Sequence, residues 1–208
     1  MFYRTKDHHG LPHDPFKSCV APRPIGWLTT LSAAGVVNLA PFSFFNGVAA
    51  SPPIVIVGIN DSGATKDTLA NCRATGEFVV NMATWDLREV MNLTSAALPA
   101  DVDEMALVGL TPAPSKLVKP PRVAESPINM ECKVLQFVEL PSDDPDARNT
   151  TIFGQVHGIH IDESVLTDGM VDVTKLKPIA RMGYMDYAVV EQVFEMRRPS
   201  AEQAMARG

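Results

Sequence analysis

The chain contains few cysteines and no long hydrophobic run. Its 208 residues include three isolated cysteines, Cys19, Cys72 and Cys132, and no CxxC pair. An odd number of isolated cysteines fits free thiols in a reducing compartment, so we expect the cytoplasm as the location. The longest apolar run, Ile54–Gly58, is the size of a strand, and a membrane-spanning helix needs about 18 apolar residues. Residues 1–15 have no apolar stretch, so we expect no secretory signal.

A basic surface and the glycine motifs of nucleotide-binding folds are also missing. Lys and Arg number 18 against 24 Asp and Glu, which gives a formal net charge of −6. The basic residues are scattered, whereas nucleic-acid binding needs a basic face that neutralises phosphates, so we expect no such partner. Neither GxxxxGK[ST] nor GxGxxG occurs, which leaves a P-loop or a Rossmann fold without support.

Proline and glycine are frequent and divide the chain into short segments. The 17 prolines and 13 glycines separate runs that are rich in Val, Ile and Phe, as is typical of strands. Ile25–Leu31 and Val36–Leu39 flank a turn and predict a hairpin. Residues 141–149 are polar and predict an exposed loop. The other predicted strands are Ile54–Ile59, Glu77–Met82, Lys133–Leu140 and Thr150–Ile161.

Helical signals are fewer. Lys66–Cys72 predicts a short helix. Trp85–Ala97 is the strongest candidate, because Thr84 can cap its start and apolar residues recur at helical spacing. The remaining expectations are a connection with an acidic turn at 98–110, a helical turn within 166–176 and a frayed polar tail at 197–208.

Many strands with a few inserted helices favour a β-barrel over a doubly wound sheet. The length suits one domain with a sizeable core, and 46% hydrophobic residues is ordinary for a globular protein. No internal repeat is visible. We therefore expect one mainly β domain over residues 1–208, with a core at about 15–190 between an N-terminal arm and a C-terminal tail.

Ligand-binding residue types gather in residues 21–46, 64–71 and 178–187. Hydroxyl groups and Asn38 lie close to Phe44, a set that suits a flat ring with a phosphate, although a hairpin packed into a core explains the same residues. Lys66 and Thr68 open a predicted helix whose amides suit a phosphate, although a solvated helix start is the simpler interpretation. Arg181 sits among apolar residues and requires either a carboxylate partner or a ligand phosphate.

The order of motifs along the chain is informative beyond the single residues. APRPI, TT and NLAPFSFFN are followed by SPPIV, KDTLAN and FVVN, and later by GLTP, SP with EC, GQV and RMG. This order resembles the flavin reductase-like, FMN-binding split-barrel family, which includes flavoredoxin-like proteins. The resemblance covers roughly residues 15–190. Its first segment is specific, whereas KDT or RxG alone would be a weak signal.

The resemblance implies a split β-barrel with FMN as cofactor, in a homodimer that holds the flavin near the subunit interface. It implies hydride transfer from NADH or NADPH to the flavin, which then passes electrons to an acceptor or a partner monooxygenase. The alternative is a flavoredoxin-like FMN electron carrier without direct nicotinamide turnover. A ligand-binding barrel without redox chemistry and a relative of pyridoxamine-phosphate oxidases rank lower.

By the same resemblance, the strand with Thr29 and Thr30 lies along the ring and the ribityl chain. Ser43, Lys66 and Thr68 would hold the phosphate, and no residue is implied as a general acid or base. The full set of implied flavin-binding residues is Arg23, Thr29, Thr30, Asn38, Leu39, Ala40, Ser43, Phe44, Lys66, Thr68 and Arg181.

Histidine and cysteine give no metal or nucleophile prediction. His8, His9 and His13 lie in a flexible arm. His157 and His160 are three apart on one predicted strand and therefore face opposite sides, so they cannot chelate a metal together. Cys132 is expected to be buried, and no cysteine has the adjacent base of a reactive thiol.

Overall fold

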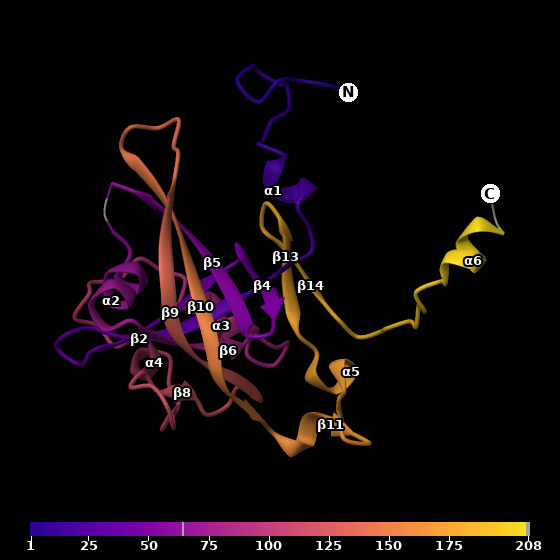
Figure 1. The fold of residues 1–208 in the computed structure, drawn as a ribbon. Helices are drawn as coiled ribbons and strands as arrows, with labels where there is room; N and C mark the ends of the chain where they lie inside the picture. The colour runs from indigo at the N-terminus through magenta and orange to yellow at the C-terminus, as the bar shows by residue number, and fades with distance from the viewer. Residues whose placement is uncertain (64, 207–208) are drawn as a thin grey trace.

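The structure is a computed structural model that describes residues 1–63 and 65–206, and antiparallel β-sheet makes up most of its regular elements (Figure 1). One large sheet dominates, with all its pairings antiparallel. Its strands in spatial order are β3 (Val37–Phe42), β2 (Gly26–Leu31), β6 (Glu77–Met82), β9 (Ile128–Leu140), β10 (Ala147–Ile161), β5 (Pro53–Ser62) and β4 (Phe45–Ala50).

Three smaller sheets complete the β structure. A three-stranded sheet has the order β1 (Arg23–Pro24), β13 (Ile179–Gly183) and β14 (Asp186–Val189). The two-stranded sheets are β7 (Pro112–Ala113) with β8 (Arg122–Val123), and β11 (Leu166–Thr167) with β12 (Met170–Val171). The hairpin β13–β14 covers most of the third segment that the sequence singles out, and the strand pattern did not predict it.

The predicted strands are confirmed as mainly β structure, with shifted ends. β9 begins at Ile128, five residues before the predicted start, and β4 was not predicted. β9 and β10 are the longest strands and form a hairpin that stands above the barrel (Figure 1). Its tip is the predicted polar loop, which is largely exposed.

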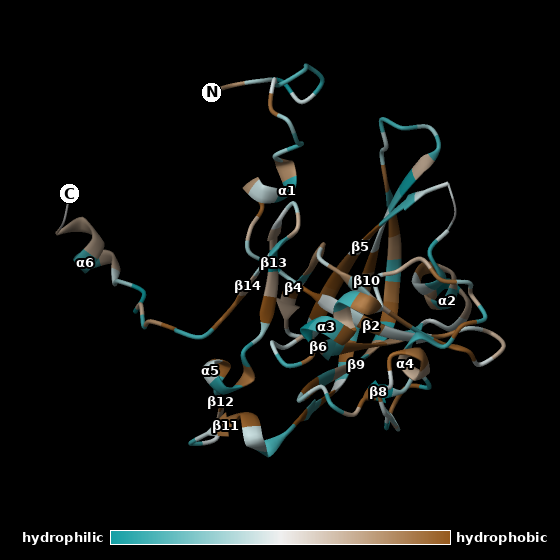
Figure 2. Ribbon diagram, turned by 180° about the vertical axis from the view of Figure 1, so that it is seen from behind, coloured by the Kyte–Doolittle hydropathy of each residue, from teal (hydrophilic) through white to brown (hydrophobic). Residues whose placement is uncertain are grey.

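Strand β2 is buried on both faces, and it separates two hydrophobic cores. Leu28 packs with Phe78 and Ile152 inside the barrel. Trp27, on the opposite face, packs with Leu39 and Met91 under the helices. Because successive side chains of a strand alternate between its faces, this single strand contributes side chains to both cores. Figure 2 shows the hydrophobic strands of the barrel beside hydrophilic connecting loops.

The helices are short. They are α1 (Phe16–Cys19), α2 (Asp67–Thr75), α3 (Arg88–Leu93), α4 (Glu104–Leu107), α5 (Val173–Leu176) and α6 (Ala201–Met205), with a 3₁₀ turn at Glu163–Val165. α2 and α5 confirm the two predicted short helical segments. α4 lies in the stretch predicted as a connection, and α6 in the tail predicted to fray. Among residues 1–63 and 65–206 no helix is long and apolar enough to cross a membrane.

The prediction of a helix over Trp85–Ala97 was wrong in its extent. α3 spans only Arg88–Leu93, and Thr84 does not cap it, because Thr84 forms an isolated bridge with Pro178. The amide of Trp85 donates to the carbonyl of Lys177 at 2.9 Å. This distant pairing uses the residues that would have formed the first turn of the helix.

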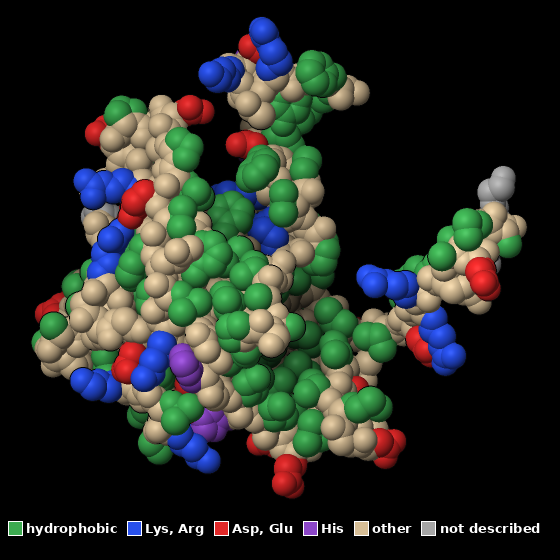
Figure 3. All heavy atoms as spheres, in the orientation of Figure 1, with side chains coloured by type: hydrophobic (Ala, Val, Ile, Leu, Met, Phe, Trp, Pro, Cys, Tyr) green, Lys and Arg blue, Asp and Glu red, His purple; other side chains and the backbone are tan. Residues whose placement is uncertain are grey.

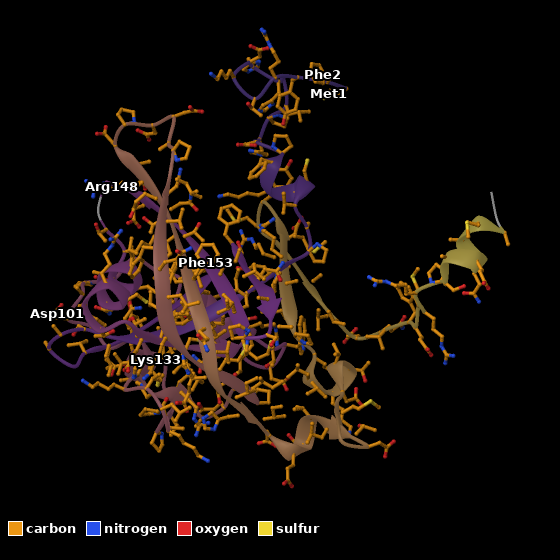
Figure 4. The ribbon with its side chains drawn as sticks, in the orientation of Figure 1. Met1, Phe2, Asp101, Lys133, Arg148 and Phe153 are labelled. Carbon is orange, nitrogen blue, oxygen red and sulfur yellow. The ribbon has the colours of Figure 1, made fainter. Side chains whose placement is uncertain are left out.

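The chain ends extend away from the barrel. Figure 4 places Met1 and Phe2 at the tip of the N-terminal arm, and both side chains are almost fully exposed. The segment after β14 runs outward to α6, whose residues are all exposed (Figure 1). α6 carries its own capping box, in which Ser200 and Gln203 bond each other's main-chain amides.

Candidate functional site

A cavity of about 650 Å³ lies between β3, β5 and the start of α2. We name it the Asn38 cavity. The segment from Thr94 to Ala100 and Glu104 form its other wall. Six of the residues that the sequence predicts for the flavin site line it, although they come from two segments far apart in the chain. These six residues are Asn38, Ala40, Ser43, Phe44, Lys66 and Thr68.

Asn38 is fixed by hydrogen bonds that leave one of its atoms available. Its Nδ2 donates to Thr68 Oγ1 at 2.9 Å and to Thr30 Oγ1 at 3.3 Å. Both of its amide hydrogens are therefore used inside the protein. In the described part of the chain no protein donor reaches Asn38 Oδ1, which can accept a hydrogen bond from a ligand.

The start of α2 provides donors for an anion. Lys66 is the N-cap residue in an extended conformation, and no side chain caps this end. The described residues offer no hydrogen-bond partner to the amides of Asp67 and Thr68, as is usual for a first turn. With the Lys66 ammonium and the Thr68 hydroxyl on the same cavity wall, this end of α2 suits a phosphate. The Asp67 carboxylate also lines the cavity.

Three of the predicted residues lie behind the cavity and not on its wall. Thr29, Thr30 and Leu39 are fully buried. Thr29 Oγ1 accepts from Asn81 Nδ2 at 2.7 Å, and Thr30 Oγ1 accepts from Asn71 Nδ2 at 3.1 Å. Their hydroxyl groups support the strand that carries Asn38 opposite Thr30, and the Leu39 side chain belongs to the core under the helices.

Glu104 is a cavity residue that the sequence reasoning missed. It opens α4, is 6% exposed, and accepts the Leu39 amide through Oε2 at 3.1 Å. Burial raises the pKa of this carboxyl group, and the charges of Asp67 and Asp103 act in the same direction, against hydrogen bonds from main-chain amides. Its only sequence signal is its place after Asp103, a good helix cap.

A second cavity of about 700 Å³ adjoins the first and contains the two predicted arginines. We name it the arginine cavity. Arg23 and Arg181 line it, and it shares Lys17, Ser43 and Ser95 with the Asn38 cavity. Arg23 is 5% exposed, and its Nε lies 3.5 Å from Ser43 Oγ. The structure thus places eight of the eleven predicted residues in two neighbouring chambers, with Ser43 in both.

Neither cavity is lined by His160, Cys72 or Cys132. His160 does not reach either cavity; its Nε2 lies 2.5 Å from Oε1 of the buried Glu131. Cys132 is buried, as predicted, and burial raises the pKa of the neighbouring Cys72 thiol to about 12. Within the described residues no three His, Cys, Asp or Glu side chains are placed to hold a metal ion.

The chain is similar to known proteins in both sequence and structure. Residues 18–178 match the sequence model of the flavin reductase like domain. An uncharacterized protein of Aquifex aeolicus is 40% identical over 167 residues, which are 79% of this chain and 82% of that protein. Nitrilotriacetate monooxygenase component B from Bacillus cereus is similar in structure, with a TM-score of 0.85, 32% identity, and coverage of 94% of this chain and 99% of that chain. The 2-nitrobenzoate 2-nitroreductase of Pseudomonas fluorescens gives a TM-score of 0.79 and 27% identity, over 89% of each chain.

Proposed function

Because this chain belongs to the flavin reductase-like family and has its split-barrel fold, we propose that it is an FMN-binding oxidoreductase. In this proposal hydride passes from NADH or NADPH to the flavin, and electrons pass on to an acceptor or to a partner monooxygenase. Two structural neighbours have names that fit this chemistry: one is a monooxygenase component and the other a nitroreductase. When bound, FMN supplies a centre that accepts hydride.

The donor set of the Asn38 cavity is the observation that carries the proposal. The cavity volume lies within the range of about 300–1,000 Å³ of small-molecule sites. Lys66, Thr68 and the amides of α2 would hold the phosphate, with the Ser43 hydroxyl nearby. Asn38 Oδ1 would accept a hydrogen bond from the edge of the ring, and Phe44 would give it an apolar wall. The residues present therefore fit FMN.

Glu104 adds a carboxyl group with a raised pKa, so it stays protonated to a higher pH than an exposed glutamate does. Since Oε2 accepts from Leu39, the other oxygen of a protonated Glu104 can donate to a ligand in the cavity. We propose that Glu104 positions the β3 backbone through the Leu39 amide and limits the negative charge at this wall.

We propose that the protein works as a homodimer. Figure 3 shows hydrophobic side chains gathered over β10, β5 and β4 on one face. β4 is an edge strand in which every residue after Phe45 is exposed, among them Val48 at 50%. An exposed apolar edge strand tends to pair with another chain. A second copy of the chain is the occupant that this proposal assigns to the face.

The proposal is tested by adding NADH or NADPH to the FMN-loaded protein without oxygen and following the visible flavin absorbance. Bleaching much faster than with free FMN is expected, and the faster nucleotide is the donor. A bound flavin that neither nucleotide reduces would instead favour the electron-carrier alternative. A protein that does not bind flavin would contradict both the reductase proposal and the electron-carrier alternative.

The phosphate assignment has its own test. Lys66→Gln should weaken FMN binding by about tenfold, as expected for the loss of a charge-assisted donor. Riboflavin lacks the phosphate, so its affinity should change little. The control is Lys116→Gln, whose side chain lies outside both cavities. Equal losses for FMN and riboflavin would contradict the assignment.

A further inference from the structure

Arg23 and Arg181 lie directly opposite each other on neighbouring strands. β1 and β13 pair antiparallel with these two residues in register, so their side chains leave the same face of the small sheet. Like charges in such a position destabilise a sheet. The pKa of the Arg23 guanidinium is lowered, first by burial and then by the charge of Arg181. The fold therefore keeps two cations together at an energetic cost.

No carboxylate in the described part of the chain offsets this cost. Among residues 1–63 and 65–206, no Asp or Glu lies within ion-pair distance of either guanidinium. Arg23 Nη1 donates to two main-chain carbonyls at the end of α1. Arg181 donates to the Tyr187 hydroxyl at 2.5 Å and to the Tyr184 carbonyl. These neutral acceptors orient the two groups and leave the double positive charge uncompensated.

Both guanidinium groups face the arginine cavity, whose walls suit a planar organic molecule. Lys17 adds a third cation to the lining. The lining also holds one carboxylate, Asp14, whose Oδ1 accepts the amide of Phe16 at 2.8 Å. The aromatic side chains around the two arginines are Phe16, Phe42, Tyr184 and Tyr187.

We propose that Arg23 and Arg181 bind the anionic group, a carboxylate or a phosphate, of the planar substrate that meets the flavin. The inference rests on the proposed function, because it places this anion in the chamber next to a bound FMN. An arginine pair with fixed orientation matches the paired oxygens of such a group. The wall that the two cavities share at Ser43 brings the body of the substrate beside the flavin chamber.

The phosphate of FMN is not the anion assigned here. Of these two cavities, Lys66 and Thr68 line the Asn38 cavity and not the arginine cavity, whereas Arg23 and Arg181 line the arginine cavity and not the Asn38 cavity. Lys17 and Ser43 line both cavities. Arg181 instead donates to Tyr187 and Tyr184 of its own hairpin, so substituting Arg181 leaves Lys66 and Thr68 in place. This separation makes the inference testable independently of flavin binding.

The test is calorimetric titration of the protein with benzoate and with ADP, in the presence and absence of FMN. Benzoate probes a carboxylate source and ADP a phosphate source. The first variant is Arg181→Gln, which removes the positive charge. The second is Arg181→Lys, which keeps the charge but loses the paired N–H donors of the guanidinium group. The control is Arg88→Gln, an exposed arginine stacked on Trp85 that does not line the arginine cavity.

At least one probe should bind the natural protein. Its affinity should fall at least tenfold for Arg181→Gln, and Arg181→Lys should have an intermediate affinity. Arg88→Gln should bind normally, and the ratio of FMN to riboflavin affinity should stay unchanged in every variant. The inference is overturned if neither probe binds, if Arg181→Gln binds them equally well, or if that variant loses its preference for FMN. If a probe binds in an Arg181-dependent way but the protein does not bind flavin, the anion site is supported and the proposed function is contradicted.

Discussion

Glu131 is a fully buried carboxylate whose oxygens accept three hydrogen bonds. The donors are the amides of Lys116 and Leu117, at 2.8 and 2.5 Å, and His160 Nε2 at 2.5 Å. Glu131→Gln replaces one acceptor oxygen by an NH₂ group that faces these donors. We expect a loss of about 1–3 kcal/mol in the free energy of unfolding, measured by urea denaturation. Glu163→Gln, at an exposed position, should change it little.

The contribution of Glu131 should depend on pH in one direction. Burial acts to raise its pKa, but the hydrogen bonds from His160, Lys116 and Leu117 prevail and lower it below the ordinary value of 4.5. A carboxyl group with a lowered pKa stabilises the folded state above its unfolded pKa and loses this effect as the pH falls. The stability gap to Glu131→Gln should shrink as the pH falls below 4.5 and through the lowered pKa of Glu131. A gap that widens in acid would contradict this sign.

Gly154 is required by a close approach and not by its backbone angles. A Cβ at this position would lie 2.3 Å from Cζ of Phe78, which is fully buried in the barrel core. Gly154→Ala should therefore destabilise the protein by about 1–3 kcal/mol, as overpacking does, and lower its melting temperature. Gly47→Ala is the matched control in β4, because no atom lies within 4 Å of its added Cβ. Equal melting temperatures for the two variants would contradict this reading.

The sequence predicts part of the site residue by residue. Residue types alone left Lys66 and Thr68 as a solvated helix start, and the resemblance to the flavin reductase-like family is what joined them with Asn38 in one predicted site. The structure places all three on the wall of the Asn38 cavity. Glu104 was missed, since its burial depends on how α4 packs against β3. Its role in the cavity therefore appears only in three dimensions.

At the scale of elements, α4 is a short helix held by one cap. Asp103 Oδ1 accepts the amide of Ala106 at 2.9 Å. Asp103→Ala should destabilise the protein by about 0.5–2 kcal/mol. It should also weaken FMN binding, because Glu104 then loses its fixed position at the cavity wall. Asp101, exposed and labelled in Figure 4, provides the control Asp101→Ala, which should affect neither flavin titration nor melting.

Strands were predicted better than helices for a physical reason. A strand such as β2 is composed largely of aromatic, β-branched and aliphatic residues (GWLTTL), so its signal is local. The start of the predicted helix at Trp85 is instead decided by pairing with Lys177 and Pro178, about half the chain away. Local spacing cannot anticipate a competitor that arrives from a distant segment. β4 escaped prediction because its small residues lack the usual strand pattern.

At the scale of the whole molecule, the dimer proposal predicts a change of mass. The natural protein should sediment as a dimer. Val48→Asp places a charge on the exposed edge strand β4 and should shift the protein toward the monomer without loss of its fold. Leu107→Asp, at a side chain 61% exposed on α4, is the control and should remain dimeric. A natural protein that sediments as a monomer at micromolar concentration would contradict the proposal.

Trp27, buried in the core under the helices, gives the molecule an internal optical reporter. Its Nε1 donates to Thr94 Oγ1 at 2.9 Å, and Thr94 lines the Asn38 cavity. The other tryptophan, Trp85, is 42% exposed and stacked against Arg88. Iodide in the solvent quenches the emission of an exposed indole, so the iodide-resistant fluorescence belongs to Trp27. That emission should dim by energy transfer as the cavity fills, which turns one residue of the hydrophobic core into a gauge of cofactor occupancy.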